Sequence, residues 1–215
     1  MNSLLRCIRK NKRAIVGIEA AIVLIAFVVI AAAMAYVVIN MGFYSAQQAK
    51  STIDKGIGEA TSALTLDGFL VGRTNATPVV SWIAIPVKLA VGQSEVDMAT
   101  DTVVIAVVGT DFALSNIYSG AENTTTKSLQ DLMFDVNASD GSAAHARTYI
   151  FNDDGNGDTV LKQNEKAYII LYLGENTLAN YSKVKIEVRT SRGAALMVQR
   201  DVPGGLPTDN IVDLG

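Results

Sequence analysis

The sequence predicts an α+β fold, in which one long N-terminal α-helix is followed by an antiparallel β-sandwich. Residues 18–49 are almost entirely apolar and carry a single charge, on Glu19. Hydrophobic residues then recur at helical spacing, and beyond residue 68 the hydrophobic period changes from that of a helix to that of strands. We therefore divide the chain into a leader over residues 1–17, a helix over 18–68 and a β domain over 69–215.

The leader combines basic charge with a glycine at its end. It carries five basic residues and no acidic one, and Gly17 is followed directly by the apolar run. A helix over residues 18–49 would extend roughly 48 Å at 1.5 Å per residue, more than the roughly 30 Å hydrocarbon core of a bilayer. The run is thus long enough to span a membrane.

Three interpretations of this N-terminus compete. The first is a signal anchor, a single transmembrane helix whose basic flank stays in the cytoplasm. The second is a conventional secretory signal cleaved near Ala31, Ala32 and Ala33, although the apolar run continues well beyond that point. The third is cytoplasmic-side cleavage between Gly17 and Ile18, which leaves the apolar helix as the N-terminus of the mature protein.

The second half of the helix is amphipathic. Ile39, Ala46, Ile53 and Ala60 are spaced seven residues apart, and polar and charged residues occupy the opposite face. Asp67-Gly68 is a typical helix stop, so we expect a linker over residues 68–77.

Seven segments of the β domain have the composition of strands, and clusters of Gly, Asn, Asp and Ser separate them. Such a series predicts an immunoglobulin-like sandwich. The expected strands cover residues 79–91, 102–108, 132–136, 148–151, 167–173, 183–190 and 194–198.

The stretch KRAIVGIEAAIVLIAFVVIAAAMAYVVINMG, followed by QQAKST, resembles the N-terminal helix of archaellins (archaeal flagellins), which is type IV pilin-like and preceded by a class III signal peptide. Residues 38–42 and 47–52 carry most of this resemblance, and residues 192–200 and 210–215 match the family more loosely. The helix differs from that of bacterial type IV pilins, because the fifth mature residue is Ile22 and the acid, Glu19, is the second.

The resemblance implies a structural subunit of the archaeal flagellum (archaellum) filament, which polymerises through its N-terminal helix for swimming. It implies cleavage between Gly17 and Ile18 by a membrane protease of the prepilin-peptidase type, although Arg13 is the nearest base to that bond. It further implies membrane insertion before assembly, an extracellular filament, and assembly-platform and motor proteins as partners. An adhesive pilus subunit, or a membrane-tethered surface domain that never polymerises, remains an alternative.

Composition restricts the function further. Removing the five leader bases leaves 13 basic residues against 21 acidic ones, a net charge of −8, which argues against a nucleic-acid partner. The only cysteine, Cys7, lies in the leader, so the mature chain has no thiolate metal site. We find no catalytic motif and expect no enzyme activity, and we expect the single histidine, His145, to lie in a solvated turn.

One turn is rich in oxygen ligands. Asn152, Asp154, Asn156 and Asp158 surround glycines, and Glu165 follows as an acid that could reach back. Calcium prefers six to eight oxygen ligands, but the twelfth position of a calcium loop here is Gln163 in place of an acid. The alternatives are a calcium site and an ordinary strand-connecting turn. We expect no required cofactor, and calcium is the candidate ligand.

Four Asn-x-Ser/Thr sequons predict glycosylation in the β domain, at Asn75, Asn123, Asn137 and Asn180. Asn123 lies in ENTTTK, which we expect to be an exposed loop, whereas Pro78 directly follows the sequon of Asn75.

Overall fold

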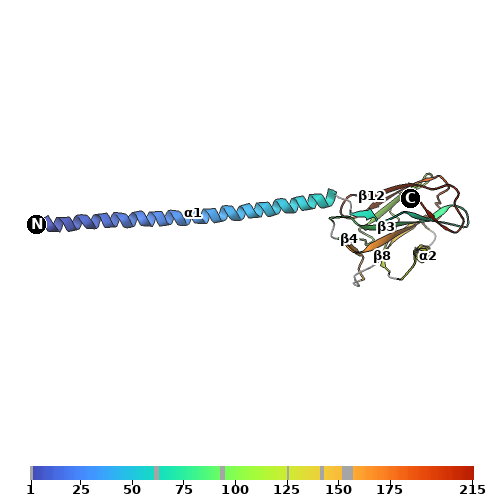
Figure 1. Ribbon diagram of the computed structural model, residues 1–215, viewed down its shortest axis with the longest axis horizontal. Coiled ribbons are helices and arrows are strands. Elements are labelled where there is room, and N and C mark those ends of the chain that lie inside the picture. The colour runs from blue at the N-terminus through green and yellow to red at the C-terminus, as the bar shows by residue number, and fades with distance from the viewer. Residues whose placement is uncertain (1, 61–62, 93–94, 125, 141–142, 152–156) are drawn as a thin grey trace. The chain divides into compact units, whose positions relative to one another are not determined.

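The computed structural model describes residues 2–60, 63–92, 95–124, 126–140, 143–151 and 157–215, with the side chains of 2–16 and 137–140 excepted. The chain forms two compact units, Met1–Lys55 and Gly56–Gly215. Figure 1 shows the helix that makes up the first unit and the β domain that makes up the second.

The first unit consists of most of one helix, α1, which runs from Asn2 to Ala60, so that its last turn belongs to the second unit. Its backbone is helical through Gly17 and Ile18, so the leader and the apolar run share one continuous helix. Alanine, leucine and methionine favour a helix, and no proline interrupts this segment.

The second unit contains two main sheets, a small two-stranded one and a short helix. The large sheet has the order β13-β2-β3-β10-β8-β7, with β1 also paired to β3, and the second has the order β12-β11-β5-β6. The pair β4–β9 forms the third sheet. The elements are β1 Leu64–Leu66, β2 Val71–Thr74, β3 Val80–Leu89, β4 Glu95–Asp97, β5 Val104–Val108, β6 Ala113–Leu114, β7 Tyr118–Asn123, α2 Leu129–Asp140, β8 His145–Phe151, β9 Val160–Lys162, β10 Lys166–Tyr172, β11 Lys183–Arg189, β12 Leu196–Asp201 and β13 Ile211–Asp213.

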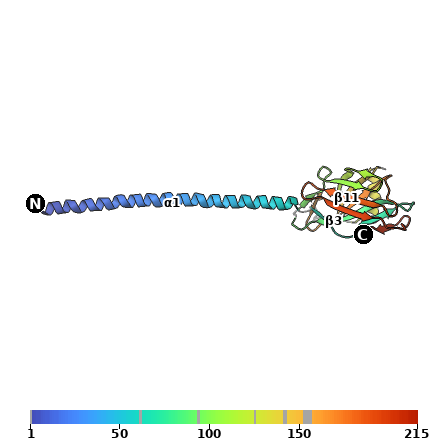
Figure 2. The same ribbon diagram turned by 90° about the horizontal axis from the view of Figure 1, so that it is seen from above.

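The main hydrophobic core lies between the two main sheets. Alternating residues of each sheet face inward, for example Ile83 and Ile169 from the large sheet and Ile105 and Ile186 from the smaller one, and all four are fully buried. In Figure 1, β12 lies on one side of β3 and α2 on the other. Figure 2 shows β11 and β3 crossing the domain in the view from above. The predicted α+β class, a long helix followed by a mostly antiparallel sandwich, is confirmed.

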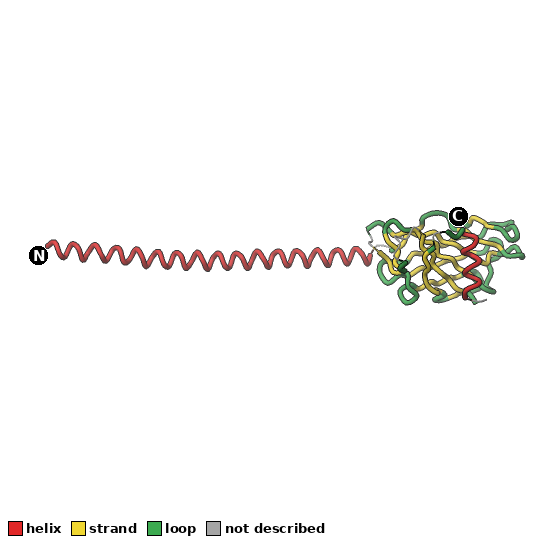
Figure 3. Tube along the Cα trace, turned by 90° about the horizontal axis from the view of Figure 1, so that it is seen from below, coloured by secondary structure: helices red, strands yellow, loops and turns green. Residues whose placement is uncertain are grey.

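The helix α2 replaces the strand that we expected over residues 132–136. Leu129, Leu132, Met133 and Val136 follow the i, i+3, i+4, i+7 spacing of a helix, and the last three pack against Tyr149 and its neighbours on the large sheet. Figure 3 shows this helix within the β domain. The strand prediction was wrong because a short apolar run fits either period.

A reciprocal cap begins α2. The Ser128 hydroxyl accepts from the Asp131 backbone N–H at 3.3 Å and donates to the Asp131 carboxylate at 2.6 Å. The Asp131 carboxylate also accepts from the Ser128 backbone N–H at 3.3 Å, and the hydrogen bonds from the Ser128 hydroxyl, first, and from this N–H lower the pKa of Asp131 below its usual value.

The expected domain boundary was also wrong. α1 ends at Ala60 and not at residue 68, because Leu64–Leu66 pairs with β3 as β1 and buries Leu64 in the core. β2 occupies part of the expected linker over 68–77. Asp67, just after β1, lies between the ammonium groups of Lys166 at 2.6 Å and Lys88 at 2.8 Å, which lower its pKa by hydrogen bonding.

The other expected strands correspond to β3, β5, β8, β10, β11 and β12, with shifted ends. One pair departs from the antiparallel pattern, because β7 runs parallel to β8. The shortest strands and β7 were not predicted, since most of them contain too few alternating apolar residues to show a period.

Candidate assembly surface

From Gly17 onward, where its side chains are described, α1 exposes a largely apolar surface. Nineteen of its large apolar side chains are at least half exposed, from Val37 at 50% to Phe27 at 71%. The segment Gly17–Ala60 is long and apolar enough to cross a bilayer by length and composition alone, with a mean hydropathy of 3.1 in its most apolar 18-residue window. Exposed apolar surface of this extent marks a site that is covered by lipid or protein.

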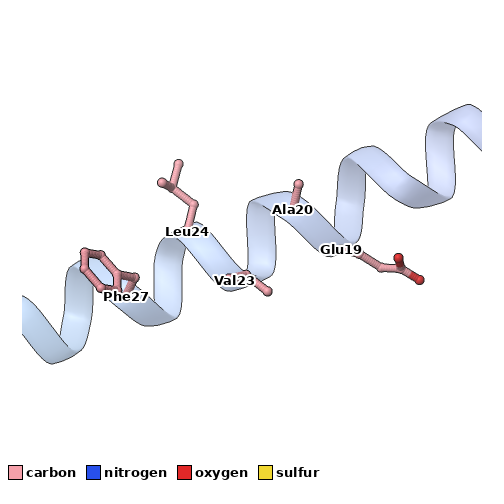
Figure 4. A pocket seen from close by; sticks show the side chains of 5 residues that line it. All are labelled: Glu19, Ala20, Val23, Leu24 and Phe27. Carbon is pink, nitrogen blue, oxygen red and sulfur yellow. The ribbon is translucent and has the colours of Figure 1, made fainter.

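Figure 4 shows one end of this surface, where Glu19 and the apolar side chains of Ala20, Val23, Leu24 and Phe27 line an open depression. Leu24 and Glu19 project from different sides of the helix. The carboxylate of Glu19 is the only charge between residues 18 and 49, so a partner that covers this end must accommodate one negative charge.

Small residues interrupt the large ones along α1. Ala31, Ala32, Ala33 and Ala35 form one group, and Gly42 follows about two turns later. A Cβ atom added to Gly42 would have no neighbour within 4 Å, so space beside the backbone is open. Such positions allow a second helix to approach closely.

The two residues of the expected cleavage site are both exposed in the helix. Gly17 has open space around its Cα, and Ile18 is 61% exposed. Cleavage between them stays a prediction.

The candidate calcium turn is only partly described. Asn152, Asp154 and Asn156 lie outside the described residues. The carboxylate of Asp158 accepts from the Val160 backbone N–H at 3.1 Å and lies 3.2 Å from the Lys162 ammonium. Glu165 is 4% exposed, and its Oε2 accepts from the Lys162 backbone N–H at 2.8 Å.

These contacts engage the two described carboxylates within the chain. In the part of the chain that the structure describes, no group of three or more His, Cys, Asp or Glu side chains is arranged to hold a metal. The calcium site therefore stays a prediction that depends on residues 152–156.

The sequons occupy different environments. Asn75 and Asn180 are exposed in turns, where a glycan has room. Asn123 is half-buried at the end of β7, so the expectation of an exposed loop was wrong. Its amide nitrogen, the atom a glycan would modify, donates to the Asp158 carbonyl at 2.7 Å. Asn137 lies in α2 and its side chain is not described.

His145 is buried, which corrects the expected solvated turn. The side chain is 5% exposed, and its ring nitrogens lie 2.7 Å from the Ala143 carbonyl oxygen and 2.6 Å from that of Val136. The ring also meets Tyr172 edge-on, with centroids 5.5 Å apart. His145, the first residue of β8, thus connects that strand to α2. The local sequence does not reveal this contact, because it joins two separate elements.

The model of the archaeal-type flagellin family matches residues 14–200, which include most of α1 and most of the β domain. The chain belongs to the archaeal-type flagellin family. It is 40% identical to probable flagellin 1 of Aeropyrum pernix over 96% of this chain and all of that protein. It is 31% identical to probable flagellin 2 of Archaeoglobus fulgidus, over 92% of this chain and 93% of that one.

The fold of this flagellin also has a solved counterpart. The crystal structure of archaeal flagellin FlaB1 from Methanocaldococcus jannaschii superposes with a TM-score of 0.59 over 72% of this chain and 97% of that chain, at 15% identity. At that identity the match supports the fold alone.

Proposed function

We propose that α1 is the segment through which this archaeal flagellin assembles, with helices of neighbouring copies packed around a common core. Membership of the family makes the chain a structural subunit of an archaeal flagellum filament. The single observation that carries the proposal is the nineteen large apolar side chains that α1 leaves exposed. Burial of apolar surface contributes about 25 cal/mol per Å², so covering these side chains gives a large favourable free energy of assembly.

The helix changes surroundings once during assembly. Before assembly α1 lies in the cell membrane, where the basic residues of the leader hold its N-terminus on the cytoplasmic side. A prepilin-peptidase-type protease removes residues 1–17, and the mature helix then leaves the lipid for the filament core. The small residues around Ala32 and Gly42 allow neighbouring helices to approach closely, both in the membrane and in the filament core.

The other parts of the proposal follow from this route. The β domain forms the outer layer of an extracellular filament, and assembly-platform and motor proteins extract and rotate the subunits. The activity is mechanical, so we infer that the chain catalyses no reaction.

Cleavage and assembly are tested together by mass spectrometry and negative-stain microscopy of filaments sheared from cells. The proposal expects filaments whose subunits begin at Ile18. Gly17→Val should leave an uncleaved precursor in the membrane fraction, whereas Gly42→Val serves as a control that leaves cleavage unchanged. A subunit that begins at Met34 would instead support a conventional signal peptide. Cell-surface material with processed chains but no filaments would support a tethered domain.

Calcium at residues 152–158 and Glu165 is a separate proposal. Asp154, Asp158 and Glu165 are close in sequence, and carboxylates that gather around one site repel one another unless a cation neutralises them, so a bound metal would stabilise the β domain. Thermal unfolding of the full chain in detergent, with calcium and with chelator, measures this effect. A melting temperature several degrees higher with calcium, lost in Asp154→Ala, supports the site. An equal melting temperature in both solutions identifies an ordinary turn.

A further inference from the structure

A row of four side chains crosses the face of the large sheet that α2 covers. Arg73 of β2 lies opposite Trp82 of β3, Trp82 opposite Tyr172 of β10, and Tyr172 opposite His145 of β8. The rings of Trp82 and Tyr172 are 5.3 Å apart. Three members of the row are aromatic and pack against one another, whereas Arg73 brings a full charge to one end.

The guanidinium of Arg73 is buried between two aromatic rings. The residue is 5% exposed, and its Cζ lies 3.7 Å from the ring centroid of Phe134 on α2 and 5.2 Å from that of Trp82. Stacking on ring faces stabilises a desolvated cation, but it provides no acceptor for the N–H groups at the edge of the guanidinium.

The nearest carboxylate among the described residues, that of Asp209, satisfies this charge only in part. Oδ1 of Asp209 lies 3.6 Å from Nη2 of Arg73, beyond normal hydrogen-bond length, and the Asp209 side chain is 70% exposed. The loop that carries Asp209 is fixed in this position, because the Asp209 N–H donates to the Asn75 carbonyl and Asn210 exchanges hydrogen bonds with Thr74. The loop therefore cannot simply be shifted to complete the pair.

In the contact of Arg73 with Trp82, three buried donors remain without an acceptor among the described residues. They are Nε and Nη1 of Arg73 and the indole Nε1 of Trp82, which belongs to a residue that is 7% exposed. Buried polar groups are hydrogen-bonded in the great majority of cases, and a buried charge without partners is costlier still. All three atoms donate, so the group that would satisfy them accepts and carries negative charge.

We propose that this cluster, consisting of Arg73, Trp82 and Phe134, binds a small inorganic anion of the halide class. A monatomic anion accepts from guanidinium and indole N–H groups together and offers no proton that would need an acceptor. The near-complete burial of Arg73 and Trp82 restricts the site to a small ion. Phe134, which is 48% exposed, covers the guanidinium and is the side chain that must move to admit the ion.

The bound anion stabilises the contact between α2 and the sheet. It neutralises the charge that Arg73 brings beneath α2, and a ligand that binds only the folded state raises stability in proportion to the logarithm of its concentration. This property concerns the β domain alone and does not depend on filament assembly.

Trp82 is the only tryptophan of the chain, so tryptophan fluorescence reports on this site alone. In the experiment, sodium bromide is added to the full chain in nonionic detergent and the fluorescence of Trp82 is recorded. Sodium gluconate is replaced by sodium bromide in equal amounts, so that the ionic strength stays constant. A bromide ion bound beside the indole quenches the fluorescence of Trp82, and this quenching saturates as the bromide concentration rises. Collisional quenching, in contrast, increases linearly with the bromide concentration. We expect saturation in the wild type and only weak, linear quenching in Arg73→Leu.

Arg189→Leu is the matched control, because Arg189 is an exposed arginine on the other main sheet and should leave the saturating curve intact. Arg73→Leu should fold, since replacing a buried charge by an apolar side chain is often neutral or stabilising. If it does not fold, Trp82→Phe removes the indole donor and keeps the ring. Its melting temperature should then rise less from gluconate to chloride than that of the wild type.

Linear bromide quenching of equal slope in the wild type and Arg73→Leu would overturn the proposal, as would identical melting temperatures of the wild type in chloride and gluconate. Either result would mean that ordinary water satisfies the three donors.

Discussion

The two units of the chain treat the same residue type in opposite ways. Ile25 in α1 is 64% exposed, whereas Ile169 in β10 is fully buried between neighbouring strands and the facing sheet. Both are apolar, and both lie in regular secondary structure. The β domain provides its own apolar environment, and α1 must find one outside the chain.

This difference separates stability from assembly. A substitution in the core of the β domain changes the free energy of unfolding, because its partners lie within the chain. In the assembly proposed above, a substitution on α1 changes the free energy of transferring the helix to lipid or to neighbouring copies. Substitutions in one unit therefore serve as controls for substitutions in the other.

The largest effect is expected from Ala32→Arg. A charge at the middle of the apolar run costs at least about 2.5–3.5 kcal/mol in a bilayer, and in a filament core it would be repeated in every subunit. Negative-stain microscopy should show no filaments. Gln48→Arg, on the polar face of α1, should leave filaments in place, and normal filaments from Ala32→Arg would contradict the buried-helix assignment.

Ile169→Ala should destabilise the β domain by about 2–5 kcal/mol, because it leaves a cavity between fully buried residues. Thermal unfolding of the full chain in detergent, followed by Trp82 fluorescence, measures the loss. Ile25→Ala should leave that transition unchanged. A comparable loss from both variants would mean that α1 contributes to the core of the domain.

The β domain should lose stability at alkaline pH through Tyr118. Burial raises the pKa of Tyr118 to about 12, and its hydroxyl donates to the Met98 carbonyl at 2.5 Å. The raised pKa contributes stability that is complete below about pH 10 and is lost as the pH rises to 12, since only the unfolded state ionises there. The loss is about 2–3 kcal/mol.

Tyr118→Phe provides the comparison for this pH dependence. It should be somewhat less stable at neutral pH, and its stability should fall less steeply between pH 10 and 12. Equal slopes for the two proteins would assign the alkaline transition to other tyrosines.

The smallest effect is expected from Ser128→Ala, which removes the N-terminal cap of α2. Loss of such a cap typically costs about 0.5–2 kcal/mol. The melting temperature should fall by a few degrees, and Ser191→Ala, at an exposed serine away from α2, should leave it unchanged. A cap variant as stable as the wild type would show that the packing of Leu132 and Met133 alone holds α2.

Sequence alone predicted α1 well and its end poorly. An unbroken apolar run of this length can be interpreted only as a helix, because strands are much shorter. Its C-terminal end was placed too late because Leu64 continues the heptad spacing of Ile57, although Leu64 in fact pairs with Leu89 in a sheet. Pairing partners 25 residues away leave no local sign in the chain.

The same limit explains the errors in the β domain. The spacing of Leu129, Leu132 and Val136 could have identified α2, but the apolar run within it looked equally like a strand. The burial of His145 depends on a carbonyl of α2, and that of Arg73 on a ring of α2. The cluster of Arg73, Trp82 and Phe134 combines residues from two strands and a helix, so no motif in the sequence marks it.

The position of β2 in the large sheet has a consequence for biosynthesis. β2 lies between β3, its neighbour in sequence, and β13, and Thr74 exchanges hydrogen bonds with Asn210, 136 residues further along the chain. A ribosome therefore releases α1 long before the large sheet can close, and a sheet of such high contact order closes slowly. If α1 enters the membrane as proposed, it does so while the β domain behind it is still unfolded, and the part of the chain that is translocated is then flexible.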